Sequence, residues 1–367
     1  MKRHGNLFSK IIDIENIRLA EKLAAKGKRN QRQVRKFEEN LEEKLVKIQQ
    51  LLANKNFHTA AYRKKTIYEP KKREISILPY SPDRIVQHAL INVLEPIWEG
   101  MMIADSYACL KKRGLHAGSK RTMDFVRKHT WCGKCDVSKF YYSIHHDKLI
   151  AILERKIKDK NVMYLLKDII DSTPGNIGLP IGNITSQWFG NIYLNELDTY
   201  IKQTLHWKDG YIRYCDDFIF TADSKEEIWK VMLAARKFIE TECGMKLSKF
   251  TVFPLSHGVD FLGYRHFKGG YILLRKSTSK RVKKKLKAIP YELKHRHMDA
   301  QHAESVVASY KGWLRWANTH NLSIATQIID LEKMVKEAKD HAQIRRLRQE
   351  GCVLADKKNI GTDRQGS

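Results

Sequence analysis

The stretch that most constrains the fold is Gly210–Ala222, which reads GYIRYCDDFIFTA. Residues that favour strands lie on both sides of two adjacent carboxylates, Asp216 and Asp217. The pattern predicts a strand, a tight turn and a second strand, with the two acids at the tip. Carboxylates held side by side repel each other and gain most by sharing a hard divalent cation. We therefore expect a metal site here, although an Asp-Asp pair alone is more often only a turn.

The charge of the chain indicates a polyanionic partner. The 367 residues include 68 Lys and Arg against 41 Asp and Glu, which gives a formal net charge of +27. Such an excess is typical of proteins that bind a polyanion and release its counterions. Nucleic acid is the leading candidate, and an anionic membrane surface is the alternative. Because the sequence shows no long apolar run and no export signal, we expect a cytoplasmic protein that does not enter a membrane.

The six cysteines are scattered and do not indicate a disulfide framework. Cys132 and Cys135 form a CxxC pair, but no second pair follows at zinc-ribbon spacing. Cys135 also falls in the apolar approach to a predicted strand. We therefore do not expect a zinc site.

A third carboxylate, Asp136, ends a short β-like run that leads into a helix predicted over about 146–157. Alone, it could be only a helix cap. It precedes Asp216 by 216 − 136 = 80 residues, which is enough for helices to return the chain to a neighbouring strand. Three carboxylates on adjacent strands suit a two-metal phosphoryl-transfer site, in which one ion activates a 3′-hydroxyl and the other holds a triphosphate. We predict that Asp136, Asp216 and Asp217 are catalytic and bind metal, with Val137 also in the metal site.

Three basic segments suit phosphate binding, although each could equally be a solvated surface. Over 57–79 we predict a hairpin that presents Lys71, Lys72 and Arg73 to a triphosphate. The segment 110–121 is predicted as a loop at a phosphate backbone, and the run 275–287 as a surface that grips a duplex. The candidate nucleic-acid contacts in the last two segments are Lys111, Lys112, Arg113, Lys280, Arg281, Lys283 and Lys284.

The loop Gly178–Gln187 precedes a helix predicted over Trp188–Ile201. Gly182 permits close approach of the backbone, and Thr185, Ser186 and Gln187 place polar groups at the helix start. Such a start suits a nucleotide or template phosphate. A plain capped helix after a Gly-Pro turn is the alternative.

In order, these motifs resemble motifs A, B, C and E of reverse transcriptases. The matching segments are Lys134–Asp136 with Phe140–Ser143, Gly178–Gln187, Tyr214–Asp217 and Phe261–Tyr264, preceded by Arg73 and Asp83-Arg84, which resemble the fingers motif. The resemblance spans about 60–320 and is specific only when the motifs are taken together. It implies an α+β right-hand polymerase fold, with fingers, a palm built of an antiparallel sheet and helices, and a helical thumb.

The resemblance also implies a division of the chain. Apolar residues at helical spacing in a charged context predict a basic helical extension over 1–55. The further parts are fingers over 56–130, palm over 131–268 with a fingers insertion at about 145–180, thumb over 269–348 and a flexible tail over 349–367.

Position by position, the resemblance makes Asp136 and Asp216 ligands of two Mg²⁺ ions, with Mn²⁺ as an alternative and Asp217 in support. Tyr141 stands where an aromatic ring excludes a ribose 2′-hydroxyl. Lys249 or Lys246 matches the motif D lysine, with spacing off by about one residue. The residues expected to bind the incoming dNTP are Arg73, Tyr141, Ile181, Gly182 and Lys249. Those of motif E expected to contact nucleic acid are Phe261, Leu262, Gly263 and Tyr264.

Within that family the chain most resembles the bacterial and phage reverse transcriptases of diversity-generating retroelements. Most reverse transcriptases have glutamine in place of Ile181 and usually Ser-Pro in place of Ser186-Gln187, and the Ser309–Trp316 segment also resembles the thumb of that subgroup. An amide at position 181 can form a hydrogen bond, whereas isoleucine offers only apolar bulk. We therefore expect Ile181, together with Gln187, to weaken the discrimination between correct and incorrect nucleotides by about 1–3 kcal/mol.

This subgroup copies a template-repeat RNA into cDNA with misincorporation opposite adenines, which diversifies a target gene by mutagenic retrohoming. The resemblance implies the RNA template, the cDNA/RNA heteroduplex, dNTPs and a small basic helical accessory protein as partners. Two alternatives are a retron-like or antiphage reverse transcriptase of ordinary fidelity and a non-catalytic RNA-binding protein on a polymerase scaffold. Three clustered acids argue against the last, because clustering like charges is unfavourable without a function.

Overall fold

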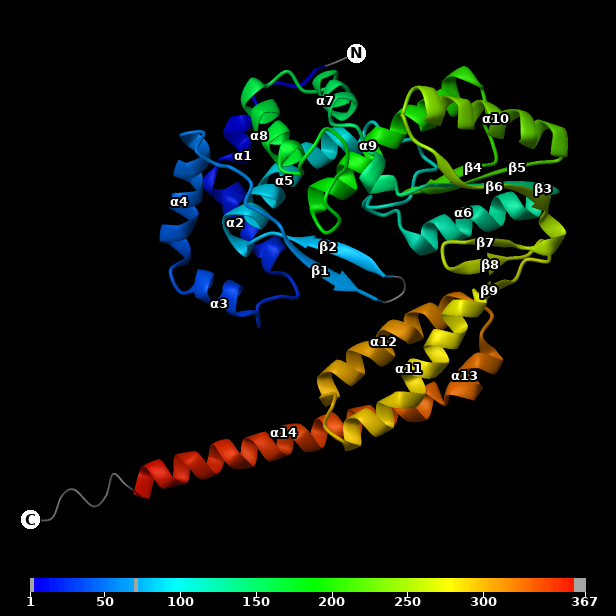
Figure 1. Cartoon of the computed structure of the whole chain (residues 1–367). Coiled ribbons are helices and arrows are strands. Elements are labelled where there is room, and N and C mark those ends of the chain that lie inside the picture. The colour runs from blue at the N-terminus through cyan, green and yellow to red at the C-terminus, as the bar shows by residue number, and fades with distance from the viewer. Residues whose placement is uncertain (1–2, 69–71, 360–367) are drawn as a thin grey trace, which may run out of the picture. The chain divides into compact units, whose positions relative to one another are not determined.

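The structure is a computed structural model that describes residues 3–68 and 72–359, with side chains described as far as residue 343. It divides into unit 1, which ends at Leu255, and unit 2, which begins at Ser256 (Figure 1).

Unit 1 combines helices with one central sheet and one hairpin. Its helices are α1 (Phe8–Ile11), α2 (Ile14–Ala25), α3 (Arg32–Glu38), α4 (Leu41–Ala53), α5 (Ile85–Glu99), α6 (Leu115–Lys128), α7 (His146–Glu154), α8 (Lys160–Asp171), α9 (Ile184–Thr199) and α10 (Lys225–Thr241). Its strands are β1 (Arg63–Ile67), β2 (Arg73–Ile77), β3 (Trp131–Val137), β4 (Tyr211–Tyr214), β5 (Asp217–Ala222) and β6 (Leu247–Pro254).

The central sheet has the strand order β4-β5-β3-β6, and all of its pairings are antiparallel. The alternating β-branched and aromatic residues of β5 are buried, as are Cys132 and Cys135 of β3. Helix α10 packs on β3, β5 and β6, and α6 lies on the opposite face (Figure 1). The predicted α+β class, with an antiparallel palm sheet, is confirmed.

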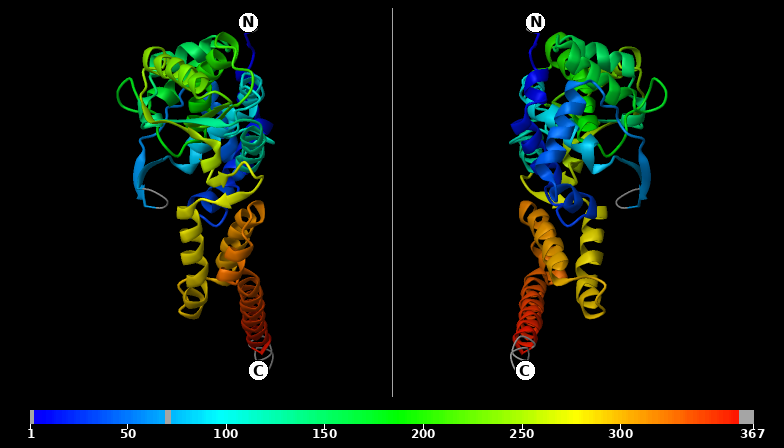
Figure 2. Two further views of the ribbon diagram at one scale, coloured as in Figure 1. Left: turned by 90° about the vertical axis from the view of Figure 1, so that its right-hand side faces the viewer. Right: turned by 90° about the vertical axis from the view of Figure 1, so that its left-hand side faces the viewer.

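The hairpin β1–β2 also forms as predicted, with Arg63 opposite Ile77 and Ile67 opposite Arg73. Both views of Figure 2 show it, in light blue, extending from the helical part of unit 1. Glu69 and Lys71 of the predicted turn lie outside the described residues.

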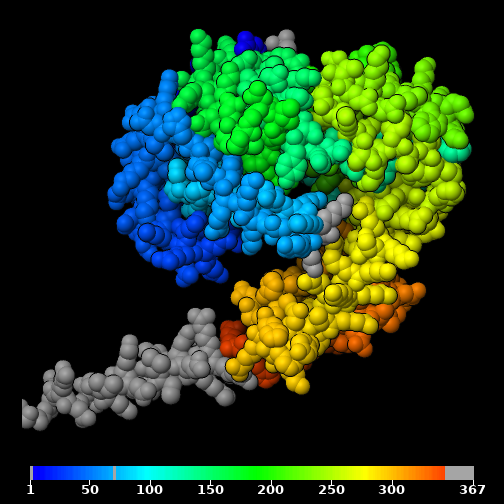
Figure 3. Space-filling view, viewed as in Figure 1, coloured from blue at the N-terminus to red at the C-terminus, as the bar shows by residue number. Residues whose placement is uncertain are grey.

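The N-terminal helices are an integral part of the unit 1 core. Ile11, Ile17 and Ala20 are fully buried, and α2 packs along α5. The Asn16 amide donates to the carbonyl of Ala89 at 3.1 Å. Figure 3 shows the N-terminal segment of the chain, in dark blue, packed against the rest of unit 1. The segment predicted as an extension over 1–55 therefore contributes apolar burial that the following helices need.

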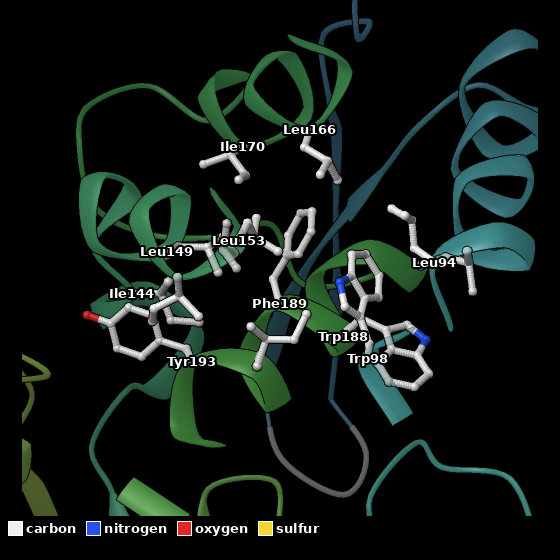
Figure 4. Close-up of a cluster of buried hydrophobic side chains, with 14 of the residues drawn as sticks. Leu94, Trp98, Ile144, Leu149, Leu153, Leu166, Ile170, Trp188, Phe189 and Tyr193 are labelled. Carbon is white, nitrogen blue, oxygen red and sulfur yellow. The ribbon is translucent and has the colours of Figure 1, made fainter. Parts of the chain in front are cut away.

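A cluster of large apolar side chains fixes helix α9 (Figure 4). The Trp98 ring of α5 lies 5.7 Å from the ring of Trp188 and 6.1 Å from that of Phe189, centroid to centroid. Tyr193, one turn further along α9, donates its hydroxyl hydrogen to the carbonyl of Cys243 at 2.7 Å. Because α9 follows the predicted motif B loop, this packing also anchors that loop.

Three element boundaries differ from the sequence prediction. The segment 110–121 is not one loop, because α6 begins at Leu115. Its Gly118 is buried inside the helix and serves packing instead of ending the helix. Helix α9 begins at Ile184, four residues before the predicted start, and α14 continues to Asn359, which lies within the segment 349–367 predicted as a flexible tail.

Unit 2 consists of a small antiparallel sheet and a group of helices, seen from two sides in Figure 2. Its elements are β7 (Val259–Phe261), β8 (Tyr264–His266), β9 (Ile272–Leu274), α11 (Lys276–Lys294), α12 (Ala300–Trp316), α13 (His320–Thr326) and α14 (Ile328–Asn359). Among the described helices of the chain, none combines the length and the apolar character needed to cross a bilayer.

Gly133 of β3 sets how closely α10 approaches the sheet. A Cβ there would lie 2.7 Å from Cγ2 of Ile228 and still closer to Sδ of Met232. We expect Gly133→Ala to lower the free energy of unfolding by about 1–3 kcal/mol, because α10 must move away from β3. Urea denaturation monitored by circular dichroism measures the free energy of unfolding of the variant and of the wild type.

Gly114→Ala is the matched control, since nothing lies within 4 Å of a Cβ at Gly114. It should change stability by less than about 0.5 kcal/mol. Equal stability of Gly133→Ala and the wild type would show that the α10 contact is loose.

Candidate active site

The sheet register brings the three predicted carboxylates to one end of the β3–β5 pair. Asp136, near the end of β3, is the direct cross-strand partner of Asp217, the first residue of β5. The backbone N–H of Val137 donates to the carbonyl of Asp216 at 3.1 Å. Asp136 and Asp217, 217 − 136 = 81 positions apart in the sequence, are therefore neighbours, as predicted.

A buried arginine holds the Tyr214–Asp217 turn in place. The Arg213 guanidinium donates to the carbonyl of Cys215 at 3.0 Å and to both carboxylate oxygens of Asp198, the shortest contact being 2.6 Å. Both side chains are fully buried. Burial acts to lower the pKa of Arg213, but the Asp198 carboxylate outweighs it and raises that pKa above its usual range. Arg213 therefore stays charged and positions the turn.

Sequence reasoning missed both members of this pair. An arginine at an alternate position of an otherwise apolar strand, two residues after Tyr211, was a signal that could have identified Arg213. Asp198 had no such signal, because only the packing of α9 against β4 shows that its carboxylate meets the guanidinium.

The surroundings of Asp216 and Asp217 disfavour their ionised forms. Burial raises the pKa of Asp217 to about 6, even though Lys134 Nζ lies 3.5 Å from its Oδ2. Its other carboxylate oxygen, Oδ1, is buried without a hydrogen-bond partner. Burial also raises the pKa of Asp216, and the negative charge of Asp136 adds to that effect. The ionised carboxylates at this site therefore lower the stability of the fold, as is common at functional sites.

Lys249 is the better of the two candidate motif D lysines. It lies opposite Asp136 in the β3–β6 pairing, and its Nζ is 2.7 Å from Asp136 Oδ2. Lys246 meets β3 through its backbone, where its carbonyl accepts from the N–H of Ser138. The structure thus places Lys249, and not Lys246, in contact with a predicted metal ligand.

The donor set suits a hard divalent cation. Within the described residues, no three His, Cys, Asp or Glu side chains are already gathered as a metal cluster. The three carboxylates nevertheless supply oxygen donors, one of them an unpartnered buried oxygen, and their excess negative charge is offset at present by Lys134 and Lys249. Asp136 and Asp216, with Asp217 beside them, are the residues that would hold such an ion.

Tyr141 lies on a short 3₁₀ helix, Phe140–Ser143, directly after β3. Its hydroxyl contacts the thiol of Cys215, and burial raises the pKa of Tyr141 above its usual range. A Cβ on Gly190 of α9 would lie 2.9 Å from the ring of Phe140 and 3.3 Å from that of Tyr141. The ring expected to exclude a ribose 2′-hydroxyl is thus held close against α9, next to the Tyr214–Asp217 turn.

The predicted motif B loop is tied to the β1–β2 hairpin. The N–H of Ser76 donates to the carbonyl of Ile181 at 2.8 Å. Gly182 has φ +130°, and a Cβ there would lie 2.6 Å from the Ser76 carbonyl oxygen, so only glycine fits. The Ile181 side chain remains half-exposed. The charge of Arg73, on the same hairpin, acts to lower the pKa of Asp216, which places Arg73 within electrostatic reach of that carboxylate.

The basic residues predicted in the 110–121 segment are partly used inside unit 1. Lys111 forms an ion pair with Glu95, and Arg113 donates to the carbonyl of Ile103 at 2.6 Å. Lys112 is exposed. Lys111 and Arg113 therefore hold the loop in place, which the charge pattern alone could not reveal.

In unit 2 the motif E side chains are structural. Phe261 and Tyr264 are fully buried and Leu262 nearly so. The Tyr264 ring stacks on Trp313 at 5.4 Å, and a Cβ on Gly263 would lie 2.9 Å from the same indole. Contact of these buried side chains with nucleic acid, expected from the sequence, does not fit this packing. Only the backbone of the Leu262-Gly263 turn is left for such a contact.

Helix α11 has the predicted basic face. Lys280, Lys283 and Lys284 are exposed and Arg281 is half-buried. Val282, Leu286 and Ile289 are buried on the opposite side of the helix. The cations therefore face solvent along one side of α11.

An antiparallel sheet with three acids at one end, flanked by helices, defines a palm-type polymerase domain. Residues 62–266 match the family model described as "Reverse transcriptase (RNA-dependent DNA polymerase)", which is more than half of the chain. The chain belongs to the reverse transcriptase family. The prediction of an RNA-directed DNA polymerase, a nucleotidyltransferase, is confirmed at the level of this family.

Several known proteins are similar to the chain. Protein YkfC of Escherichia coli is 26% identical over 277 residues, which are 62% of this chain and 70% of that protein. The group II intron-encoded protein LtrA of Lactococcus lactis is 27% identical over 44% of this chain and 29% of that protein. Nuclear intron maturase 4 of Arabidopsis thaliana is 24% identical over 41% of this chain and 20% of that protein.

Two solved telomerase structures also align with the fold. Telomerase from Candida albicans, with a fragment of telomeric RNA, has a TM-score of 0.45 at 11% identity, over 77% of this chain and 62% of that chain. Apo telomerase from Candida tropicalis has a TM-score of 0.46 at 12% identity, over 75% and 62%.

Asp217→Asn should stabilise the protein in a metal-free buffer. Because the folded-state pKa of Asp217 is raised to about 6, the ionised carboxylate lowers stability above that pH. We expect a gain of about 1–3 kcal/mol near pH 8 in EDTA, shrinking as the pH falls through about 6 and disappearing only well below about 4, where the unfolded carboxyl is protonated as well. Chemical denaturation across this pH range measures it.

Asp124→Asn is the control, since Asp124 is exposed on α6. It should leave stability within about 0.5 kcal/mol of wild type at every pH. A loss of stability in Asp217→Asn near pH 8 would mean that the carboxylate is satisfied, not strained.

Proposed function

We propose that the chain copies RNA into DNA, by adding deoxynucleotides to a primer 3′-end. The observation that carries the proposal is the β3–β5 register, which sets Asp136 beside Asp217 and next to the turn that holds Asp216. Mg²⁺ ions bound there, or Mn²⁺ in their place, would lower the pKa of the primer 3′-hydroxyl and neutralise the triphosphate. The residues that would hold them are the three carboxylates.

The surrounding residues have separate tasks in this proposal. Arg73 supplies a guanidinium fork for the triphosphate of the incoming dNTP. Tyr141, packed against Gly190, fills the space that a ribose 2′-hydroxyl would need. Lys249 keeps a positive charge beside Asp136, on the same end of the sheet. The exposed cations of α11 and Lys112 suit contacts with the phosphate backbone of an RNA template or heteroduplex.

Asp216→Ala should abolish primer extension on an RNA template. Losing one metal-binding carboxylate removes several kcal/mol of transition-state stabilisation, so we expect a loss of at least about 100-fold. Asp124→Asn, exposed on α6, is the control and should extend primers like wild type. If wild type and variant both bind RNA and neither extends a primer, the protein is a non-catalytic RNA-binding protein.

We further propose that the chain belongs to the diversity-generating retroelement subgroup and misincorporates opposite template adenines. The support is Ile181, whose half-exposed apolar side chain stands on a loop fixed to β2 where most reverse transcriptases carry an amide. Without that amide, fewer polar contacts restrain the base pair that forms between the template and the incoming nucleotide. The same proposal includes a template-repeat RNA and a small basic helical accessory protein as partners.

Ile181→Gln should lower misincorporation opposite template adenine by about tenfold, because one restored hydrogen bond contributes about 1.4 kcal/mol. Deep sequencing of the cDNA measures the error frequency at each template base. Ile181→Leu is the control, since it keeps the apolar bulk and should keep the wild-type error frequency. A low error frequency in wild type, unchanged in Ile181→Gln, would favour an enzyme of ordinary fidelity instead.

A further inference from the structure

Two cysteines from distant segments meet beside the catalytic turn. The segment that ends at Cys109 runs parallel to β4, because the N–H of Tyr107 donates to the carbonyl of Arg213 at 3.1 Å and the N–H of Arg213 donates to that of Asp105 at 3.0 Å. In this pairing Ser106 is the partner of Arg213, so two residues further along Ala108 lies opposite Cys215 and Cys109 follows directly. The two thiols lie close enough to interact, and their interaction lowers the pKa of Cys109 and raises that of Cys215.

Both cysteines are held in place by helix α9 and its partners. Asn191 of α9 donates its amide hydrogen to the carbonyl of Ala108 at 2.7 Å, and Gln187 accepts from the Cys109 thiol at 3.3 Å. On the other side, Arg213 fixes the carbonyl of Cys215. Both cysteines have a left-handed backbone, with φ +56° and +54°, a conformation that persists only where the surroundings impose it. The backbone of both cysteines is therefore held in place beside the Tyr214–Asp217 turn.

Access distinguishes this pair from the other described cysteines. Cys109 is exposed and Cys215 is half-buried, whereas Cys132, Cys135 and Cys243 are buried. A small oxidant can reach Cys109 from solvent, and the product of its oxidation would already lie next to a second thiol. An accessible thiol beside a resolving thiol is the usual arrangement of a reversible redox site.

We propose that Cys109 and Cys215 are a modification site at which hydrogen peroxide oxidises the two thiols to a reversible disulfide that stops copying. The Cys109 sulfur attacks the peroxide, the O–O bond breaks, and a sulfenic acid and one water form. The Cys215 sulfur then attacks the sulfenic sulfur, the S–S bond forms, and the hydroxyl leaves as a second water. The two thiols lose two electrons and two protons, and the peroxide is reduced to two waters.

The effect on copying rests on the proposed polymerase function. Cys215 immediately precedes Asp216, and its thiol also contacts the Tyr141 hydroxyl. A disulfide requires a bond of about 2.05 Å and a torsion near 90°. The Cys215 sulfur must therefore leave its present contacts and pull on the turn. A displacement of catalytic groups by about 1 Å costs about 100-fold in rate.

The bond itself can be tested without an activity assay. The full-length protein is treated with hydrogen peroxide, its remaining thiols are alkylated, and a non-reducing digest is analysed by mass spectrometry. We expect one linked pair of peptides, containing Cys109 and Cys215, that disappears after dithiothreitol. No linked pair, or Cys109 linked to any other cysteine, would overturn the proposal.

The consequence is tested by primer extension on the same samples. Peroxide should reduce wild-type extension by about 100-fold, and dithiothreitol should restore it. Cys109→Ser and Cys109→Ala should extend primers with or without peroxide, while the control Cys243→Ala should remain as sensitive as wild type. A disulfide formed with no loss of extension, or equal sensitivity of the Cys109 variants, would refute the switch. If untreated wild type does not extend primers, the polymerase proposal fails, and the mass spectra still decide whether the bond forms.

Discussion

The antiparallel pairing of β3 with β5 is the constraint on which the candidate site depends. It fixes Asp136 opposite Asp217, and a slip of one residue would turn each carboxylate to the other face of the sheet. The pairing must also hold like charges together, which burial makes unfavourable for Asp216 and Asp217. The close packing of α10 at Gly133 and the aromatic core under β5 supply the stability that offsets this charge clustering.

Helix α9 connects the parts of unit 1 that the site needs. Trp98 packs against its apolar face. Its buried polar residues Asp198 and Asn191 both bind Arg213, which holds the Tyr214–Asp217 turn. Asn191 also donates to the carbonyl of Ala108. Removing one partner of a buried ion pair commonly costs about 3–5 kcal/mol, because the other charge is left uncompensated. The Arg213–Asp198 pair is therefore a mechanical support for the turn as well as a local interaction.

The motifs of the site could be predicted from the sequence, because strand alternation and adjacent acids are local signals. The partnership of Asp136 with Asp217 was an inference from chain length and strand order that the register confirms. Long-range contacts were not predictable: Arg213 with Asp198, Cys109 with Cys215, and the burial of Ile17 against α5. Charge and aromaticity also do not reveal which groups the fold itself uses. Lys111 pairs with Glu95 and Arg113 donates to the Ile103 carbonyl, while Phe261 and Tyr264 are buried.

The contacts that hold the Tyr214–Asp217 turn also explain why a disulfide between Cys109 and Cys215 would stop copying. A site whose carboxylates are already strained tolerates little displacement. The turn that carries Asp216 is held by a hydrogen bond from the buried Arg213 guanidinium to the Cys215 carbonyl and by one from the Val137 N–H to the Asp216 carbonyl. A covalent bond from Cys215 to the segment beside β4 would act on that same backbone. Such rigidity makes the site responsive to a change in one neighbouring bond.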